Sequence, residues 1–227
     1  MFIRKDNTIK WNWILIGALI TLALVIAGVC GLDKVVYSLI HQTDCNAWSY
    51  DRGILCTAAV VLGKIFSTKM WVILSALSVV GFFLYKAIRN ENDFRYAFVK
   101  IKNSYVFYIF TSVILAVMTT GIFKVLIGHA RPVLFDALGK TYFEPWTFNS
   151  VFNSMPSGHT AASFAGLVMI GLLFPRAKYF TWALAIIIAL SRVYVGAHWP
   201  TDVIFGAFIG MVCADLVKVI LKKINSK

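Results

Sequence analysis

The sequence predicts an all-α protein, a polytopic bundle of six helices that cross a membrane. Of its 227 residues, 59% are hydrophobic and only 14% are charged, whereas a soluble domain is nearer about 45–50% apolar and about 25% charged. The apolar residues are concentrated in long blocks, which is typical of segments that meet lipid. The cations are spread unevenly over the segments that separate these blocks. These three observations favour a membrane bundle over a soluble domain.

Six segments are apolar enough to be candidate spans. A helix needs roughly 20 mostly apolar residues to cross the hydrocarbon core. The segments are Trp11–Gly31, Met70–Ala87, Ser104–Phe123, Thr160–Phe174, Tyr179–Ala197 and Val203–Leu221. Because they take up about half of the chain, we expect residues 1–227 to form a single membrane domain without a separate soluble one.

The first segment resembles a secretory signal only in part. Arg4, Lys5 and Lys10 precede an apolar run, as they would in a signal peptide. However, this run is long enough to cross, and the pattern of small residues expected at a cleavage site is poor after Gly31. We expect the segment to be retained as a span.

The cations predict the orientation of the bundle. With six spans, the amino terminus, the 87–103 loop, the 175–178 turn and the carboxyl terminus lie on one side, and that side carries 14 of the 22 Lys and Arg residues. They are Arg4, Lys5, Lys10, Lys86, Arg89, Arg95, Lys100, Lys102, Arg176, Lys178, Lys218, Lys222, Lys223 and Lys227. Cytoplasmic loops are enriched in these residues, so both termini are expected in the cytoplasm. The net charge of +12 therefore reflects topology, and nucleic acid is not an expected partner.

Residues 32–69 are expected to form an extracytoplasmic loop. Apolar residues recur at helical spacing over residues 35–40, and Ile54–Leu62 is apolar but short for a span. Both pieces are predicted to be interfacial helices that lie along the membrane. If Ile54–Phe66 crosses instead, the amino terminus changes sides while the later segments keep their mutual relation.

The four cysteines fall into two pairs. Cys30 and Cys213 lie in spans and are interpreted as packing residues. Cys45 and Cys56 lie in the predicted outward loop, where an oxidising environment permits a disulfide. Their spacing matches no metal motif, so a disulfide between them is our hypothesis.

The second outward loop, residues 125–158, is rich in aromatic side chains. They are Phe135, Tyr142, Phe143, Trp146, Phe148 and Phe152. Such side chains favour the headgroup layer because they combine an apolar body with a polar edge. They are interpreted as a membrane-anchoring belt or as the rim through which a lipid enters.

Ionisable residues close to the spans gather in three short segments. The first, at the end of the third span, is Lys124-Val-Leu-Ile-Gly-His-Ala-Arg131-Pro132. Seven residues make almost two helical turns, so Lys124 and Arg131 can share a face, and Pro132 would then stop the helix. By themselves, the two residues would be read as cations that extend to the membrane surface.

The second segment, Pro156-Ser157-Gly158-His159, enters the fourth span. Ser157 is a candidate N-cap, and Gly158 allows the backbone to approach a ligand closely. Because the free N–H groups and the positive end of the dipole lie there, a helix start can bind an anion. His159 is expected in the first turn.

The third segment is Ser191-Arg192-Val-Tyr-Val-Gly-Ala-His198-Trp-Pro-Thr-Asp202. Pro200 is well placed as the first helical residue, so His198 precedes the last span and Asp202 lies in its first turn. A carboxylate in that position can reach back to the imidazole, fix its tautomer and raise its basicity.

Alternating crossings bring the three segments to the same face of the membrane. Three cations, two histidines and one aspartate then converge where charges are costly, so their default interpretation is functional. Lys124, Arg131 and Arg192 can surround a tetrahedral dianion. His198, oriented by Asp202, can attack phosphorus while His159 protonates the departing oxygen. No carboxylate cluster is available for Mg²⁺, so we expect neither a metal nor another cofactor.

These three segments, in this order, resemble the signature of the type-2 phosphatidic acid phosphatase family. The matching patterns are a Lys followed after six residues by Arg-Pro, then Pro-Ser-Gly-His, then Ser-Arg followed after five residues by a His and after three more by an Asp. The resemblance implies an outward-facing, metal-independent site that removes phosphate from lipids. It implies His198 as the nucleophile, His159 as the general acid and Asp202 as the orienting carboxylate. It further implies that phosphate is bound by Lys124, Arg131, Ser157, Gly158 and Arg192.

The sequence is thus interpreted as a lipid phosphatase of the bacterial cytoplasmic membrane that faces the periplasm or exterior. Compact bacterial members of the family use undecaprenyl diphosphate, phosphatidylglycerophosphate or lipid A phosphates. An isoprenoid diphosphate ranks first and lipid A phosphate close behind. The alternatives are a lipid-to-lipid phosphotransferase and a non-catalytic binder or transporter, although a binder has no need of a paired nucleophile and acid. Soluble relatives that oxidise halides fit poorly with six spans.

Overall fold

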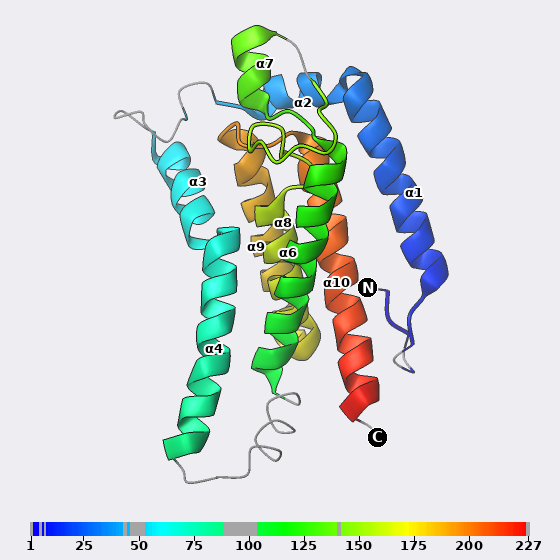
Figure 1. Ribbon diagram of the computed structural model, residues 1–227, viewed down its shortest axis with the longest axis vertical. Helices are drawn as coiled ribbons and strands as arrows, with labels where there is room; N and C mark the ends of the chain where they lie inside the picture. Colours follow the sequence, from blue (N-terminus) through cyan, green and yellow to red (C-terminus); the bar gives the residue numbers. More distant parts are fainter. Residues whose placement is uncertain are drawn as a thin grey trace.

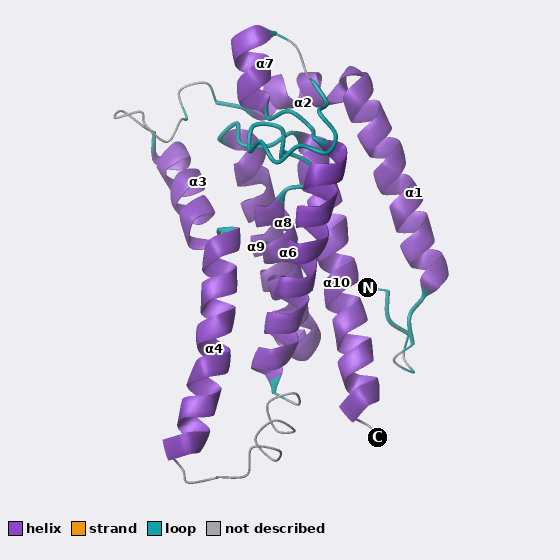
Figure 2. Ribbon diagram, in the orientation of Figure 1, coloured by secondary structure: helices purple, strands orange, loops and turns teal. Residues whose placement is uncertain are grey.

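A computed structural model describes residues 2–4, 6, 8–42, 45, 53–88, 104–139 and 142–225, and these residues are almost entirely helical (Figures 1 and 2). The helices are α1 (Trp11–Ala27), a π-helical stretch (Gly28–Leu32), α2 (Asp33–Ile40), α3 (Ile54–Ile65), α4 (Thr68–Ile88), α6 (Tyr105–Ile127), α7 (Pro132–Leu138), α8 (Gly158–Leu173), a 3₁₀ turn (Pro175–Ala177), α9 (Lys178–Tyr194) and α10 (Pro200–Asn225). Within the described residues, extended pairing is limited to two isolated bridges.

Each of the six predicted spans corresponds to a helix. They are α1, α4, α6, α8, α9 and α10. Five helical stretches are long and apolar enough to cross a membrane, whereas α8, with 16 residues, is shorter than the others. Residues 89–103 of the predicted cytoplasmic loop, with four of its cations, lie outside the described residues.

Helix α8 forms the centre of the bundle. It contacts α4, α6, α9 and α10, and most of its residues are buried. Small residues make this possible: Ala161, Ala162 and Ala165 are fully buried, and a Cβ on Gly210 of α10 would meet the backbone of α8. Small side chains allow helix backbones to approach closely, so α8 is held firmly where its first turn enters the candidate site.

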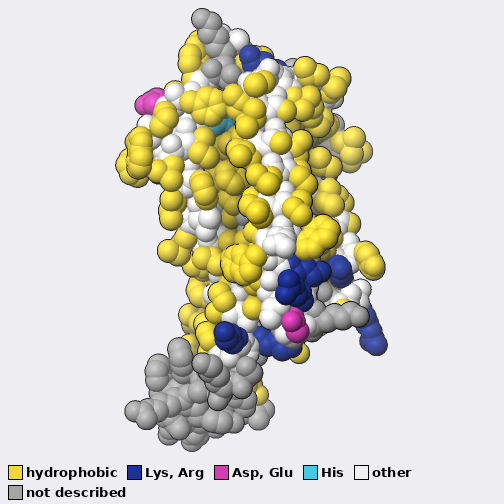
Figure 3. All heavy atoms as spheres, turned by 90° about the vertical axis from the view of Figure 1, so that its right-hand side faces the viewer, with side chains coloured by type: hydrophobic (Ala, Val, Ile, Leu, Met, Phe, Trp, Pro, Cys, Tyr) yellow, Lys and Arg dark blue, Asp and Glu magenta, His cyan; other side chains and the backbone are white. Residues whose placement is uncertain are grey.

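The outer surface of the bundle is apolar. Leu15, Leu19 and Leu22 of α1 are more than half exposed. Hydrophobic side chains cover most of the face shown in Figure 3, and Lys and Arg gather toward its lower end. A soluble protein rarely exposes so large an apolar surface, so this pattern supports a multi-pass membrane protein.

The 32–69 region differs in part from the prediction. Helix α2 lies across one end of the bundle (Figure 1). By contrast, α3 packs against α9 and runs in the same direction as α4, so the prediction that it lies along the membrane surface is wrong. Only Phe66 and Ser67 separate α3 from α4, and the two helices together make one pass along the bundle. Ala59 and Gly63 on one face of α3 let it sit directly on α9.

The disulfide predicted between Cys45 and Cys56 is confirmed. It ties the first turn of α3 to the segment that follows α2. Of the other two cysteines, Cys213 is buried, as expected of a packing residue, whereas Cys30 is exposed on the surface of the bundle.

Candidate active site

The three sequence segments meet at one end of the bundle. This is the end where α6 and α9 finish and where α8 and α10 begin, below α7 and the 142–157 loop in Figure 1. Because successive helices run in opposite directions, four helix ends meet here. The charged groups of the three distant segments meet with them.

Helix α6 ends earlier than predicted. Its last residue is Ile127, and Gly128 adopts the left-handed conformation with φ of 62°. Pro132 therefore does not stop α6, and it begins α7 instead. The chain turns at Gly128 because Glu144 packs on it: a Cβ there would overlap the carbonyl oxygen of Glu144. Arg131 consequently lies on a loop and not on the same helix face as Lys124.

Lys124 and Arg131 are nevertheless brought together, by the loop. The ammonium of Lys124 donates to the carbonyl oxygens of Asn153 and Ser154. The guanidinium of Arg131 donates to Asn153 O at 3.4 Å, to Ser150 O at 2.9 Å and to Ala197 O at 3.1 Å. Burial lowers the pKa of Arg131, and the Asp202 carboxylate opposes this, but a guanidinium stays protonated at neutral pH. Two cations thus flank one loop carbonyl.

The turn at Gly128 gives a testable prediction with a matched control. Gly128→Ala should destabilise the protein by about 3 kcal/mol or more, because it combines left-handed strain with a backbone overlap. Gly139 ends α7 with φ of 66°, and a Cβ there would meet no atom within 4 Å among the described residues, so Gly139→Ala should cost only about 1–2 kcal/mol. Thermal unfolding in detergent compares the two variants. Equal losses would show that the contact with Glu144 is unimportant.

The second segment forms the predicted helix entry. Ser157 caps α8, and its hydroxyl accepts from the backbone N–H of Thr160. The backbone N–H of Ser157 donates to Asp202 O at 2.8 Å, which joins the starts of α8 and α10. A Cβ on Gly158 would lie 3.8 Å from Cε of Lys124. The second segment is therefore held beside both of the others.

Asp202 is the centre of the site's hydrogen bonds. It is fully buried in the first turn of α10, which begins at Pro200 as predicted. Its Oδ2 accepts from Trp199 N at 2.9 Å and from the hydroxyl of Ser154. The same Oδ2 lies 3.4 Å from Nδ1 of His198. A proton on Nδ1 leaves the other ring nitrogen, Nε2, with a free lone pair.

The environment of His198 keeps its imidazole neutral. The ring is buried, and burial lowers its pKa to about 3. The hydrogen bond with Asp202 opposes this shift, whereas the charges of Lys124 and Arg131 add to it. Because a neutral imidazole is the nucleophilic form, His198 does not need to lose a proton at neutral pH.

His129 was not expected in the site from the sequence. Its Nδ1 lies 2.9 Å from Oδ1 of Asp202. Since a carboxylate only accepts, His129 carries its proton on Nδ1 and donates it. Phe143 stacks on its ring with centroids 4.6 Å apart. The residue lies inside the first motif, but only the turn at Gly128 directs its side chain inward. Ser154 was also missed, because it lies outside the three sequence segments and reaches Asp202 only through the fold.

Arg192 approaches the site from another side. It is buried, and its Nη2 donates to Ala59 O of α3 at 2.7 Å and to the hydroxyl of Ser191 at 3.0 Å. Arg192 and His159 line the same cavity, of about 630 Å³. The structure thus brings Lys124 of α6 and Arg131 together at the carbonyl of Asn153, and it places Arg192 beside His159 at the cavity.

The aromatic residues of the second loop divide into two groups. Phe135 packs on Trp199 with ring centroids 5.5 Å apart, and Phe143 stacks on His129. These two rings are therefore part of the packing around the site. Trp146 and Phe148 are 74% and 85% exposed, which fits the predicted belt. Within the described residues, no three His, Cys, Asp or Glu side chains are grouped so as to bind a metal.

Comparison with known proteins gives both a family and relatives. A model of the PAP2 superfamily matches residues 105–226. The chain is 40% identical over 103 residues to a lipid A 1-phosphatase of Rhizobium etli, covering 45% of this chain and 44% of that protein. It is 35% identical over 104 residues to an undecaprenyl-diphosphatase of Sulfolobus acidocaldarius, covering 44% of this chain and 47% of that protein. Each match thus spans less than half of the relative.

A solved structure has a similar fold. It is the first transmembrane PAP2-type phosphatidylglycerolphosphate phosphatase from Bacillus subtilis, with a TM-score of 0.56 and 19% identity. The similarity covers 93% of this chain and 96% of that chain. The helical arrangement therefore extends beyond the matched segment to α1–α4.

Proposed function

This chain belongs to the PAP2 superfamily, and from that premise we propose that it is an integral-membrane phosphatase that removes phosphate from an envelope lipid. One observation carries the proposal: a buried neutral imidazole, His198, is held by Asp202 beside the cations Lys124 and Arg131. A site that only binds phosphate needs the cations but not an oriented nucleophile. The names of the relatives, which include a lipid A 1-phosphatase and an undecaprenyl-diphosphatase, agree with this chemistry.

The proposed reaction has two steps. Nε2 of His198 attacks phosphorus, and the bond between phosphorus and the lipid oxygen breaks. The electron pair stays on that oxygen, which receives a proton from His159. Water then attacks the phosphohistidine while His159 takes a proton from it, so that free phosphate leaves and both imidazoles return to their starting state.

The cations do the electrostatic work in both steps. Lys124, Arg131 and Arg192 stabilise the charge on the oxygens of the transferred phosphoryl group. The backbone N–H groups of Gly158 and His159, at the start of α8, add hydrogen bonds to the same group in this proposal, since the N–H of Ser157 already donates to Asp202 O. Asp202 keeps Nδ1 of His198 protonated and offsets the positive charge that develops on the ring.

We further propose a six-pass topology as one domain over residues 1–227, with both termini in the cytoplasm and the site facing the periplasm or exterior of a bacterial cytoplasmic membrane. Because α3 and α4 run in one direction and together make a single pass, α3 does not reverse the orientation of the amino terminus. Helix α8, although short, lies at the centre of the bundle and is shielded from lipid.

The activity is tested with purified protein and phosphorylated lipids. We expect free phosphate to be released from undecaprenyl diphosphate, phosphatidylglycerophosphate or lipid A, with turnover persisting in excess chelator and inhibited by vanadate, a mimic of the phosphoryl group in transfer. Complete loss with EDTA that Mg²⁺ restores would contradict the metal-independent mechanism. If the phosphate appears on a second lipid instead of in water, the enzyme is a phosphotransferase.

Cysteine labelling tests the topology. Phe148, at the site end, and Tyr179, at the opposite end, are 85% and 84% exposed. In a background with Cys30 and Cys213 replaced by serine, an impermeant thiol reagent should label Phe148→Cys in intact spheroplasts. It should label Tyr179→Cys only after lysis, because α9 begins at the cytoplasmic side. The reverse pattern would place the site in the cytoplasm.

A further inference from the structure

The cavity that contains His159 and Arg192 has a second wall. The cavity lies between the start of α8, the end of α9 and the turn that joins α3 to α4 (residues 63–70, here called the α3–α4 turn). Lys64, Ser67 and Lys69 line it from the α3–α4 turn. Its volume of about 630 Å³ is within the range of about 300–1,000 Å³ that is common for ligand sites. The cavity therefore joins the phosphate site to two lysines that lie outside the sequence motifs.

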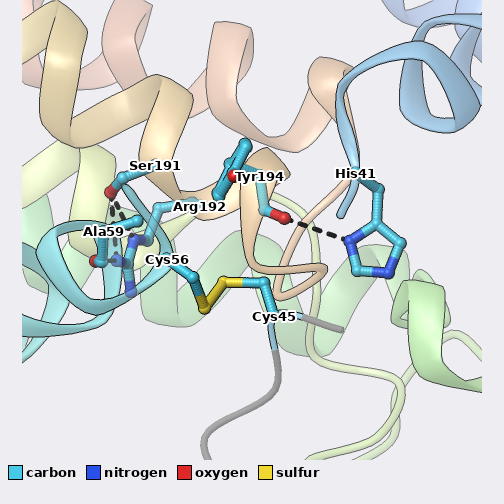
Figure 4. The surroundings of a disulfide bond; sticks show 7 residues. All are labelled: His41, Cys45, Cys56, Ala59, Ser191, Arg192 and Tyr194. Carbon is cyan, nitrogen blue, oxygen red and sulfur yellow. Dashed lines mark hydrogen bonds between the residues drawn. A yellow bond between two sulfur atoms is a disulfide. The ribbon is translucent and has the colours of Figure 1, made fainter. Parts of the chain in front are cut away.

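The α3–α4 turn is fixed against the phosphate site at two points. A Cβ on Gly63 would overlap the guanidinium of Arg192, and Arg192 donates to Ala59 O one turn earlier. Thr68 Oγ1 lies 3.3 Å from the place where a Cβ on Gly158 would be. The disulfide of Cys56 anchors the start of α3 near these contacts (Figure 4). The backbone that carries Lys64 and Lys69 is thus held in place by contacts with Arg192 and with the start of α8.

Lys64 and Lys69 are exposed cations without a carboxylate partner among the described residues. Lys69 lies in the first turn of α4, where the helix dipole disfavours positive charge. Apolar side chains of Val60, Met70 and Ile73 line the same cavity. The two lysines share this cavity with Arg192 and His159, so they add to the positive charge that is already there. The ligand that offsets both the charge and the dipole is an anion.

We propose that Lys64 and Lys69 bind a second phosphate of the substrate, next to the phosphate held by Lys124, Arg131 and Arg192. This inference rests on the proposed function and makes lipid diphosphates the preferred substrate class. His198 attacks the terminal phosphorus, and the bridging P–O bond breaks. The electron pair stays on the bridging oxygen of the lipid monophosphate, which receives the proton of His159, and the two lysines stabilise the negative charge of the other oxygens of that phosphate. Water then attacks the phosphohistidine while His159 takes a proton from it, so that the terminal phosphate leaves His198.

Two substrates that differ only in one phosphate test the proposal. For farnesyl diphosphate, the double variant Lys64→Gln/Lys69→Gln should lower kcat/KM about tenfold or more, because two charge-assisted contacts are lost. For farnesyl monophosphate, the change should stay within about twofold, because that substrate does not reach the lysines. The control is Lys34→Gln, which removes a cation of α2 that lies over Phe135 and does not line the cavity. An equal loss on both substrates, or no loss on either, would overturn the inference.

Binding measurements separate this inference from the proposed function. By calorimetry, wild-type protein should bind inorganic pyrophosphate about tenfold more tightly than inorganic phosphate, and the double variant should lose this margin. This result needs no turnover, so it supports the second anion site even if no lipid is hydrolysed. If wild-type protein hydrolyses lipids but has no preference for pyrophosphate, the proposed function stands and the second site is rejected.

Discussion

His198→Ala should abolish the phosphoenzyme and lower kcat/KM by about 10⁴-fold or more. The reason is that the neighbouring Asp202 holds the tautomer of His198, and a proton on Nδ1 leaves the lone pair of Nε2 for the attack. Rapid quench with ³²P-labelled substrate should trap an acid-labile, base-stable label in wild-type protein and none in the variant.

The controls for this experiment are two other histidines. His41, which hydrogen-bonds to Tyr194 O and stacks on Tyr37, lies outside the site, so His41→Ala should keep the label. His159→Ala should still form the phosphoenzyme with an activated aryl phosphate, whose leaving group needs no protonation. With an alkyl lipid phosphate it should be slower by about 10²–10⁴-fold. A label that survives in His198→Ala and vanishes in His159→Ala would reverse the two roles.

Asp202→Asn should lower kcat by about 10³–10⁴-fold, the second largest effect that we expect. The carboxylate accepts from Trp199 N, Ser154 and His129 and faces Nδ1 of His198. An asparagine has one oxygen that accepts and one NH2 group that donates. Its oxygen would face some of these donors, and its NH2 group would face the others. His198 would then lose both its fixed tautomer and the charge that stabilises its cationic form.

The measurement is single-turnover phosphoenzyme formation, which should be slowed but not abolished. Asp136→Asn is the matched control, because Asp136 accepts from the hydroxyl of Tyr37 at 3.0 Å at the same end of the bundle without contacting the site. Melting temperatures of both variants distinguish a loss of chemistry from a loss of folding. Near wild-type rates in Asp202→Asn would show that His198 needs no orienting carboxylate.

The sequence alone determined the local features of this protein. Blocks of apolar residues located the six long helices, because a helix that meets lipid must be apolar over most of its length. Ser157 and Pro200 located the starts of α8 and α10, because capping and the fixed φ of proline act within one turn. Asp202 was therefore expected beside His198, and the two side chains do face each other.

Only the tertiary structure decided the features that depend on residues far apart in the chain. Gly128 ends α6 because Glu144 packs on it, and this turn directs His129 to Asp202, 73 positions away. Likewise, α3 lies along the bundle because Ala59 and Gly63 receive the guanidinium of Arg192. No periodicity or cap signals such contacts, since they depend on the packing of one segment's surface against another. The sequence thus predicted the groups of the candidate site, and the packing of the loop and of α3 determined which neighbours hold them.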